Sequence, residues 1–136
     1  MRTETLYKIV TANNITLDTH PLPENKSLCL EVGDRIFIAI DPEILQSAAS
    51  ERVCLAHELG HCQTGSFYNL YSGLDIRQKH ENRADKWAIT KLIPEKELDK
   101  AILNGNHDLF SLAEHFCVTE DFMKKALKLY KKIDIA

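Results

Sequence analysis

Residues 53–63 read VCLAHELGHCQ, and the interpretation of the whole chain starts from this stretch. Its apolar residues continue a spacing that begins near Ser47 and is typical of a helix. Side chains four positions apart lie on the same helix face, so the imidazoles of His57 and His61 can reach one metal ion. We therefore expect a helix from about Ser47 to Gln63 that carries a metal site. The alternative is an ordinary solvated helix, because so short a pattern also arises by chance.

Zinc is the metal that this arrangement favours. It accepts histidine nitrogen and carboxylate oxygen in a four-coordinate site that keeps one position open for water. Glu58 lies about 100° around the helix from His57, beside such a metal rather than on it. There its carboxylate can take a proton from the attacking water and pass it to a leaving amine. Glu58 is therefore the candidate catalytic base and acid.

A third protein ligand must come from elsewhere in the chain. The metzincin pattern is excluded, because Thr64 and Phe67 stand where it requires glycine and histidine. Glu81 is the best candidate, since it follows a loop long enough to reverse the chain. Asp85 lies one turn further on and can accept a hydrogen bond from a ligating imidazole. The alternative for both carboxylates is a solvated helix face with basic partners at Lys79, Arg83 and Lys86.

Other polar residues near these motifs are weaker candidates. His80 adjoins Glu81 and could donate a hydrogen bond to a developing oxyanion, as could Tyr68 and Tyr71 in the preceding loop. Surface or packing roles are the alternative for each of them. Cys54 could approach the metal, but a buried core thiol is the plainer interpretation. Three histidines have no partner pattern and receive no chemical role: His20, His107 and His115.

The order of the predicted elements indicates an α+β domain, with a small sheet first and helices after it. A short opening helix is followed by strands around Ile15–Leu17 and over residues 27–32 and 35–41, the last two joined at Gly33-Asp34. Further helices are expected over residues 77–91, from Pro94 to Asn104, and over residues 108–116 and 119–132. We expect one domain, divided into a sheet region (1–46), metal-site helices (47–95) and a helical tail (96–136).

Composition excludes several classes of protein. The 136 residues include 17 Lys and Arg against 20 Asp and Glu, a net charge of −3, which argues against a surface devoted to nucleic acid. No apolar run approaches the roughly 20 residues that a membrane helix needs. The four cysteines form no Cys-x-x-Cys pair, and no signal peptide is apparent. We therefore expect a cytoplasmic protein whose thiols are small buried hydrophobes.

Three motifs in order resemble those of the ImmA/IrrE family of zinc metallopeptidases. They are HELGH at residues 57–61, ENRADKWA at 81–88 and LIP at 92–94. The resemblance implies a minimal zincin-like fold, with zinc bound by His57, His61 and Glu81 and with Glu58 as the catalytic acid and base. Asp85 stands where the family more often has Asn.

The resemblance also implies a protein partner, because such proteins are often encoded on phages and mobile elements beside a helix-turn-helix repressor that they cleave. The tail suggests an alternative, since residues 109–129 are similar to a helix-turn-helix. Residues 122–136 carry five Lys and one Asp, against a net charge of −7 for residues 1–121. The alternative function is a non-proteolytic regulatory module that binds a repressor or DNA. The plainer interpretation of the tail is two amphipathic helices on the core, and without arginine it is poorly suited to base readout.

Overall fold

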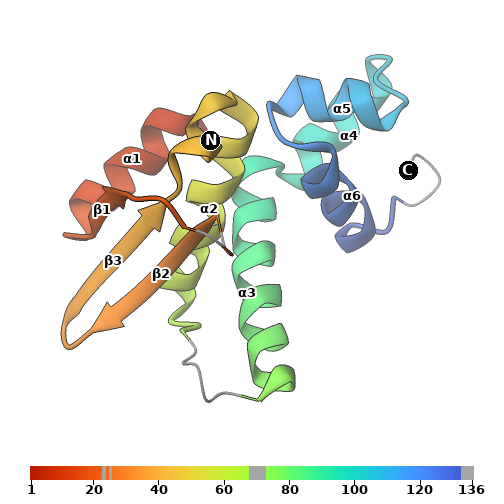
Figure 1. Cartoon of the computed structure of the whole chain (residues 1–136). Coiled ribbons are helices and arrows are strands. Elements are labelled where there is room, and N and C mark those ends of the chain that lie inside the picture. Colours follow the sequence, from red (N-terminus) through yellow and green to blue (C-terminus); the bar gives the residue numbers. More distant parts are fainter. Residues whose placement is uncertain (23, 25, 68–72, 133–136) are drawn as a thin grey trace.

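The computed structural model describes the chain except for residues 23, 25, 68–72 and 133–136. Its elements follow the predicted order and confirm the α+β class (Figure 1). They are α1 (Thr3–Ala12), β1 (Thr16–Thr19), β2 (Ser27–Val32), β3 (Arg35–Ile40), the 3-10 helix η1 (Pro42–Gln46), α2 (Ala48–Thr64), α3 (Leu74–Leu92), α4 (Glu95–Leu103), α5 (Leu109–Phe116) and α6 (Glu120–Leu129).

The three strands form one small mixed sheet in the order β1-β3-β2. β2 and β3 are joined at Gly33-Asp34 as predicted, and they form an antiparallel hairpin that turns at Gly33 with φ 64°. β1 pairs with β3 in parallel, which the sequence did not reveal. Because β3 is central, β2 is an edge strand, and its first residue, Ser27, pairs with Ile40 at the end of β3.

Helix α2 lies at the centre of the molecule, between the sheet and α3 (Figure 1). The Ser47 hydroxyl caps its first turn by accepting a hydrogen bond from the Ser50 amide, and Gly65 ends it in the left-handed conformation. Leu55 and Leu59 are fully buried in the core. Because both sides of the helix are covered, its polar residues Glu58 and His61 are buried as well. The fold therefore removes the predicted catalytic residue from bulk water.

Gly60 allows α2 and α3 to approach closely. A β-carbon at this position would lie 2.5 Å from the carbonyl oxygen of Ala84 and 2.9 Å from its Cα. Both distances are shorter than ordinary van der Waals contacts. Ala84 lies between Glu81 and Asp85 on α3, so this contact sets their distance from α2.

Helix α3 begins at Leu74, earlier than the predicted start at Arg77. The Gly73 carbonyl accepts hydrogen bonds from the amides of Ile76 and Arg77 and so starts the first turn. The sequence obscured this start because Gly and Ser residues precede it. The 3-10 helix η1 was also not predicted; the Asp41 carboxylate stabilises it by accepting a hydrogen bond from the Glu43 amide.

The last two helices pack on the common core, with a break at the predicted position. Cys117 ends α5 with φ 54°, and the Thr119 hydroxyl caps α6 by accepting from the Phe122 amide. Phe122 and Leu127 are buried in the same cluster of apolar residues as Leu55. The tail thus behaves as amphipathic helices on the core, whereas its likeness to a helix-turn-helix stays a prediction.

The expectation of buried thiols is wrong for Cys117, which is exposed. It occupies the turn that ends α5, outside the helix face that packs on the core. The other three cysteines are half-buried, and the sulfur atoms of Cys29 and Cys62 lie 3.1 Å apart. All four are free thiols.

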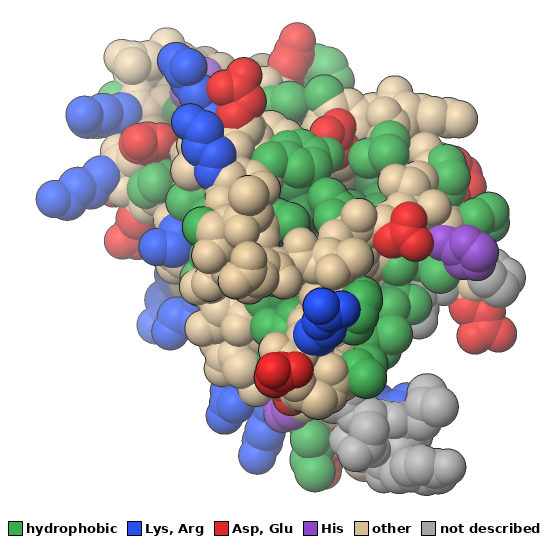
Figure 2. Space-filling model, turned by 90° about the vertical axis from the view of Figure 1, so that its left-hand side faces the viewer, with side chains coloured by type: hydrophobic (Ala, Val, Ile, Leu, Met, Phe, Trp, Pro, Cys, Tyr) green, Lys and Arg blue, Asp and Glu red, His purple; other side chains and the backbone are tan. Residues whose placement is uncertain are grey.

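Charged side chains of both signs are spread over the face on the sheet side of the molecule (Figure 2). Hydrophobic side chains lie among them, and Lys and Arg are most frequent toward one edge of this view (Figure 2). Within the described residues, no helix is both long and apolar enough to cross a membrane.

Candidate metal centre

The structure brings His57, His61 and Glu81 together where α2 faces α3. Their candidate ligand atoms all lie within 4.8 Å of one another. The Nε2 atom of His57 is 2.7 Å from one oxygen of Glu81, and that of His61 is 3.1 Å from the other. Two imidazole nitrogens and a carboxylate oxygen therefore converge on one point, which is the donor set of a catalytic zinc site.

The other ring nitrogen of each imidazole, Nδ1, contacts a hydrogen-bond acceptor. His57 Nδ1 lies 2.8 Å from Asp85 Oδ1, and His61 Nδ1 lies 2.9 Å from the carbonyl oxygen of Ser66. Both partners accept hydrogen bonds, so each Nδ1 carries the proton and Nε2 is directed at Glu81. Such acceptors fix the ring orientation and the tautomer of ligating histidines. The residues present therefore fit a metal ion.

The electrostatics of this cluster favour a cation. Burial lowers the pKa of His57, but its hydrogen bonds with Asp85 and Glu81 outweigh burial and raise the pKa to about 10. Burial likewise opposes protonation of His61, yet Glu81 and the Ser66 carbonyl raise its pKa. Burial raises the pKa of Glu81, while hydrogen bonds from both imidazoles hold it well below its usual range. Without metal, protons supply the positive charge that these carboxylates stabilise.

Glu58 lies outside the cluster of ligand atoms but beside it on α2. Only 4% of its surface is exposed, and burial is the main cause that raises the pKa of its carboxyl. Ser27, at the start of β2, donates a hydrogen bond of 2.6 Å to Glu58 Oε2. A buried carboxyl with a raised pKa, oriented by one hydrogen bond, is suited to take up and return a proton.

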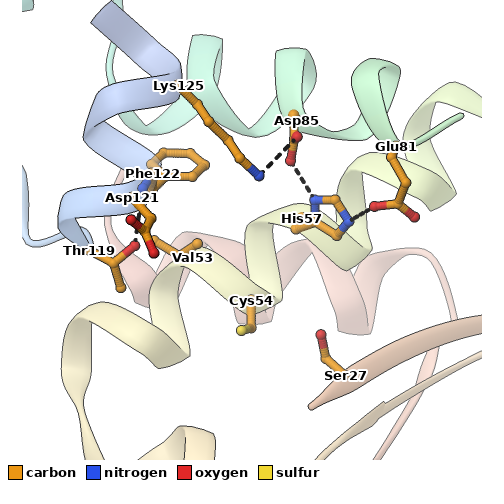
Figure 3. Close-up of a pocket in the computed structure, with 10 residues that line it drawn as sticks. All are labelled: Ser27, Val53, Cys54, His57, Glu81, Asp85, Thr119, Asp121, Phe122 and Lys125. Carbon is orange, nitrogen blue, oxygen red and sulfur yellow. Dashed lines mark hydrogen bonds and ion pairs between the residues drawn. The ribbon is translucent and has the colours of Figure 1, made fainter. Parts of the chain in front are cut away.

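Asp85 connects the cluster to the C-terminal helix. While its Oδ1 faces His57, its Oδ2 lies 3.3 Å from the Nζ of Lys125 on α6, as Figure 3 shows. Burial raises the pKa of Asp85, but the hydrogen bond with His57 and the charge of Lys125 lower it below its ordinary value. Asp85 thus lies against a candidate ligand, in the place expected of a residue that orients it.

The remaining sequence candidates lie less centrally. His80 is half-buried on α3 and is not part of the ligand cluster, so its role as an oxyanion donor stays a prediction. Cys54 is half-buried and lines the pocket beside His57, but it too is outside the ligand cluster. Tyr68 and Tyr71 lie outside the described residues.

Sequence reasoning missed the contacts that hold these side chains. Ser27 carries no motif and lies 31 positions from Glu58, so only the fold brings them together. Ser66 acts through its backbone carbonyl, which has no residue signature. Lys125 was noticed only as part of a basic tail. Lys125 lies three positions after the buried Phe122, a spacing that places both side chains on one face of α6. That spacing does not identify Asp85 as the partner of Lys125.

This geometry is compatible with the metal sites of HExxH metallopeptidases. The family model described as the IrrE N-terminal-like domain, of the peptidase M78 family, matches residues 13–128. The chain therefore belongs to this family, as the three motifs predicted. Membership implies peptidase activity and agrees with a metal ion at the His-His-Glu cluster. A comparison with curated proteins found no match.

Proposed function

We propose that the protein is a zinc-dependent endopeptidase in which His57, His61 and Glu81 hold the metal. The observation that carries this proposal is the convergence of their ligand atoms within 4.8 Å, with both Nδ1 atoms engaged by acceptors. Two nitrogens and one oxygen form the ligand set that leaves zinc a position open for water. When bound, zinc supplies Lewis acidity, which polarises a carbonyl and lowers the pKa of water.

Glu58 then serves as the general base and acid. Its buried carboxylate takes a proton from the attacking water and returns it to the amine of the leaving peptide. The Ser27 hydroxyl keeps this carboxylate oriented through Oε2, which leaves Oε1 available for the proton. Burial raises the pKa of Glu58 toward the working pH, which favours proton transfer in both directions.

A cytoplasmic helix-turn-helix repressor, of the kind carried by phages and mobile elements, is the substrate that we propose. Family resemblance suggests it. We expect recognition by docking of one folded partner, rather than broad digestion of peptides.

The test compares the wild type with Glu58→Gln and with a matched control, Glu97→Gln, at an exposed position on α4. Each protein is loaded with zinc, and metal content is measured. Each is then incubated with the repressor encoded beside its gene and with unfolded casein, and products are identified by mass spectrometry.

We expect all three proteins to bind one zinc ion and only the wild type and Glu97→Gln to cut the repressor. Equal cleavage by Glu58→Gln overturns the assigned mechanism. Failure to bind zinc overturns the metal site. A zinc-loaded wild type that cuts neither substrate overturns the peptidase assignment, and preference for casein overturns the repressor as substrate.

A further inference from the structure

A pocket of about 310 Å³ opens beside His57, between α2, the start of β2 and the N-terminal half of α6. Its lining joins the metal cluster to the tail: Ser27, Val53, Cys54, His57, Glu81, Asp85, Thr119, Asp121, Phe122 and Lys125 (Figure 3). Helix α6, for which the sequence suggested DNA binding as an alternative role, therefore lies beside the candidate metal centre. A group that enters this pocket lies next to the two metal-binding residues His57 and Glu81.

Three of the ten residues that line this pocket are apolar. Val53 and Cys54 come from α2, and Phe122 comes from α6, where it is 3% exposed and held by the core (Figure 3). Ser27 is occupied by its hydrogen bond to Glu58. Recognition pockets combine apolar residues with a few polar groups that fix selectivity. An aliphatic or aromatic side chain is the group that these three residues can contact favourably.

Two charged residues of α6, Asp121 and Lys125, also line the pocket. The amine of Lys125 is engaged by Asp85. Asp121 is exposed, and within the described part of the chain no hydrogen bond or ion pair engages its carboxylate. An acidic side chain that approached the pocket would meet this like charge. Asp121 is therefore suited to reject acidic residues at the same position.

We propose that this pocket is a specificity subsite of the peptidase, which takes an apolar side chain next to the scissile bond and excludes acidic ones. Val53 and Phe122 supply the attraction, and Asp121 supplies the repulsion. The inference rests on the proposed function, because the side chain is presented by a peptide held at the metal. It assigns the tail a role in substrate selection.

The test uses three N-acetylated amino-acid hydroxamates, of Gly, Leu and Asp, as probes of the zinc-loaded full-length protein. The hydroxamate group binds zinc in each probe, so the glycine compound reports the metal site alone. Isothermal titration calorimetry gives the affinities. We expect the leucine compound to bind at least about tenfold more tightly than the glycine compound. The aspartate compound should bind more weakly than the glycine compound.

Two variants separate attraction from repulsion. Val53→Phe fills the pocket and should abolish the tighter binding of the leucine compound while binding of the glycine compound is kept. Val53→Ala is the second variant, used if the larger side chain impairs folding; it removes contacting atoms and should reduce the advantage of the leucine compound. Asp121→Asn should strengthen binding of the aspartate compound by about threefold to fivefold. The matched control, Glu120→Gln, removes the same charge from an exposed neighbour that does not line the pocket and should change neither.

The outcomes are distinguishable. If the glycine compound does not bind the zinc-loaded protein, the proposed metal function falls and the subsite falls with it. If glycine binds and leucine binds no better, the subsite is overturned while the metal site stands. An unchanged leucine advantage in both Val53 variants has the same meaning. An unchanged affinity of Asp121→Asn for the aspartate compound overturns the role of Asp121.

Discussion

Replacement of Gly60 by alanine tests how the metal site is assembled. The added β-carbon would lie 2.5 Å from the carbonyl oxygen of Ala84, where ordinary contacts begin at 3.4 Å. The neighbours are backbone atoms of α3, which cannot rotate away as a side chain could. To relieve the contact, α2 and α3 must separate by about 0.9 Å, the difference between those two distances.

Two opposing effects set the size of the change. Overpacking of a close contact costs about 1–3 kcal/mol, and a rigid backbone neighbour favours the upper end. In a helix interior, alanine stabilises the folded state by about 1 kcal/mol relative to glycine. We therefore expect Gly60→Ala to lower the free energy of unfolding by about 2 kcal/mol. Because Glu81 and Asp85 flank Ala84, zinc affinity should also fall by about tenfold or more.

The assay is urea unfolding of the metal-free protein, followed by zinc titration against a chromophoric chelator. Gly73→Ala is the matched control, since its φ of −65° suits alanine and a β-carbon there meets nothing within 4 Å. The control should stay within about 0.5 kcal/mol of the wild type. If Gly60→Ala is as stable as the control and binds zinc normally, then this contact does not position α3.

Three further predictions concern the side chains around the cluster. Asp85→Ala should weaken zinc binding by about 10–100-fold, measured by the same competition, because His57 loses the acceptor at Nδ1; an unchanged affinity would contradict this role. Since the raised pKa of His57 is about 10, its protonation stabilises the metal-free fold fully below its ordinary pKa of 6.5. That contribution is lost as pH rises through 10, so zinc binding at pH 7 should release protons, detectable by calorimetry in buffers of different ionisation enthalpy. No proton release would show that the histidines are already neutral. Ser27→Ala should lower kcat by about tenfold and leave zinc affinity unchanged, because Glu58 loses the hydroxyl that orients its carboxylate; a kcat equal to wild type would count against the contact.

The sequence predicted most of the fold because its signals were local. Helix periodicity predicted α2 closely, since the expected range from about Ser47 to Gln63 differs by one residue at each end from the observed Ala48–Thr64. The hairpin turn was marked by Gly33. The parallel pairing of β1 with β3 could not be predicted, since strand order depends on contacts between distant segments. The start of α3 was missed because a backbone carbonyl, that of Gly73, organises its first turn.

The residues of the candidate site also fall into two groups, those that local sequence patterns predicted and those that depend on tertiary packing. His57 and His61 share one helix, so their spacing alone placed them on one face. Glu81 and Asp85 required a second helix to fold back; the length of the preceding loop indicated this, and the family motif agreed with it. Ser27 could not be found in advance, because a single serine on an edge strand has no pattern. The position of α6 beside the site also depends on tertiary packing, which left the basic tail open to a different interpretation.

The most direct test of the metal centre is a crystal structure of the zinc-loaded protein with anomalous diffraction at the zinc edge. The proposal predicts one strong anomalous peak per chain, coordinated by Nε2 of His57, Nε2 of His61 and a carboxylate oxygen of Glu81. A peak held by other residues, or no peak between α2 and α3 in crystals grown with zinc, would contradict it.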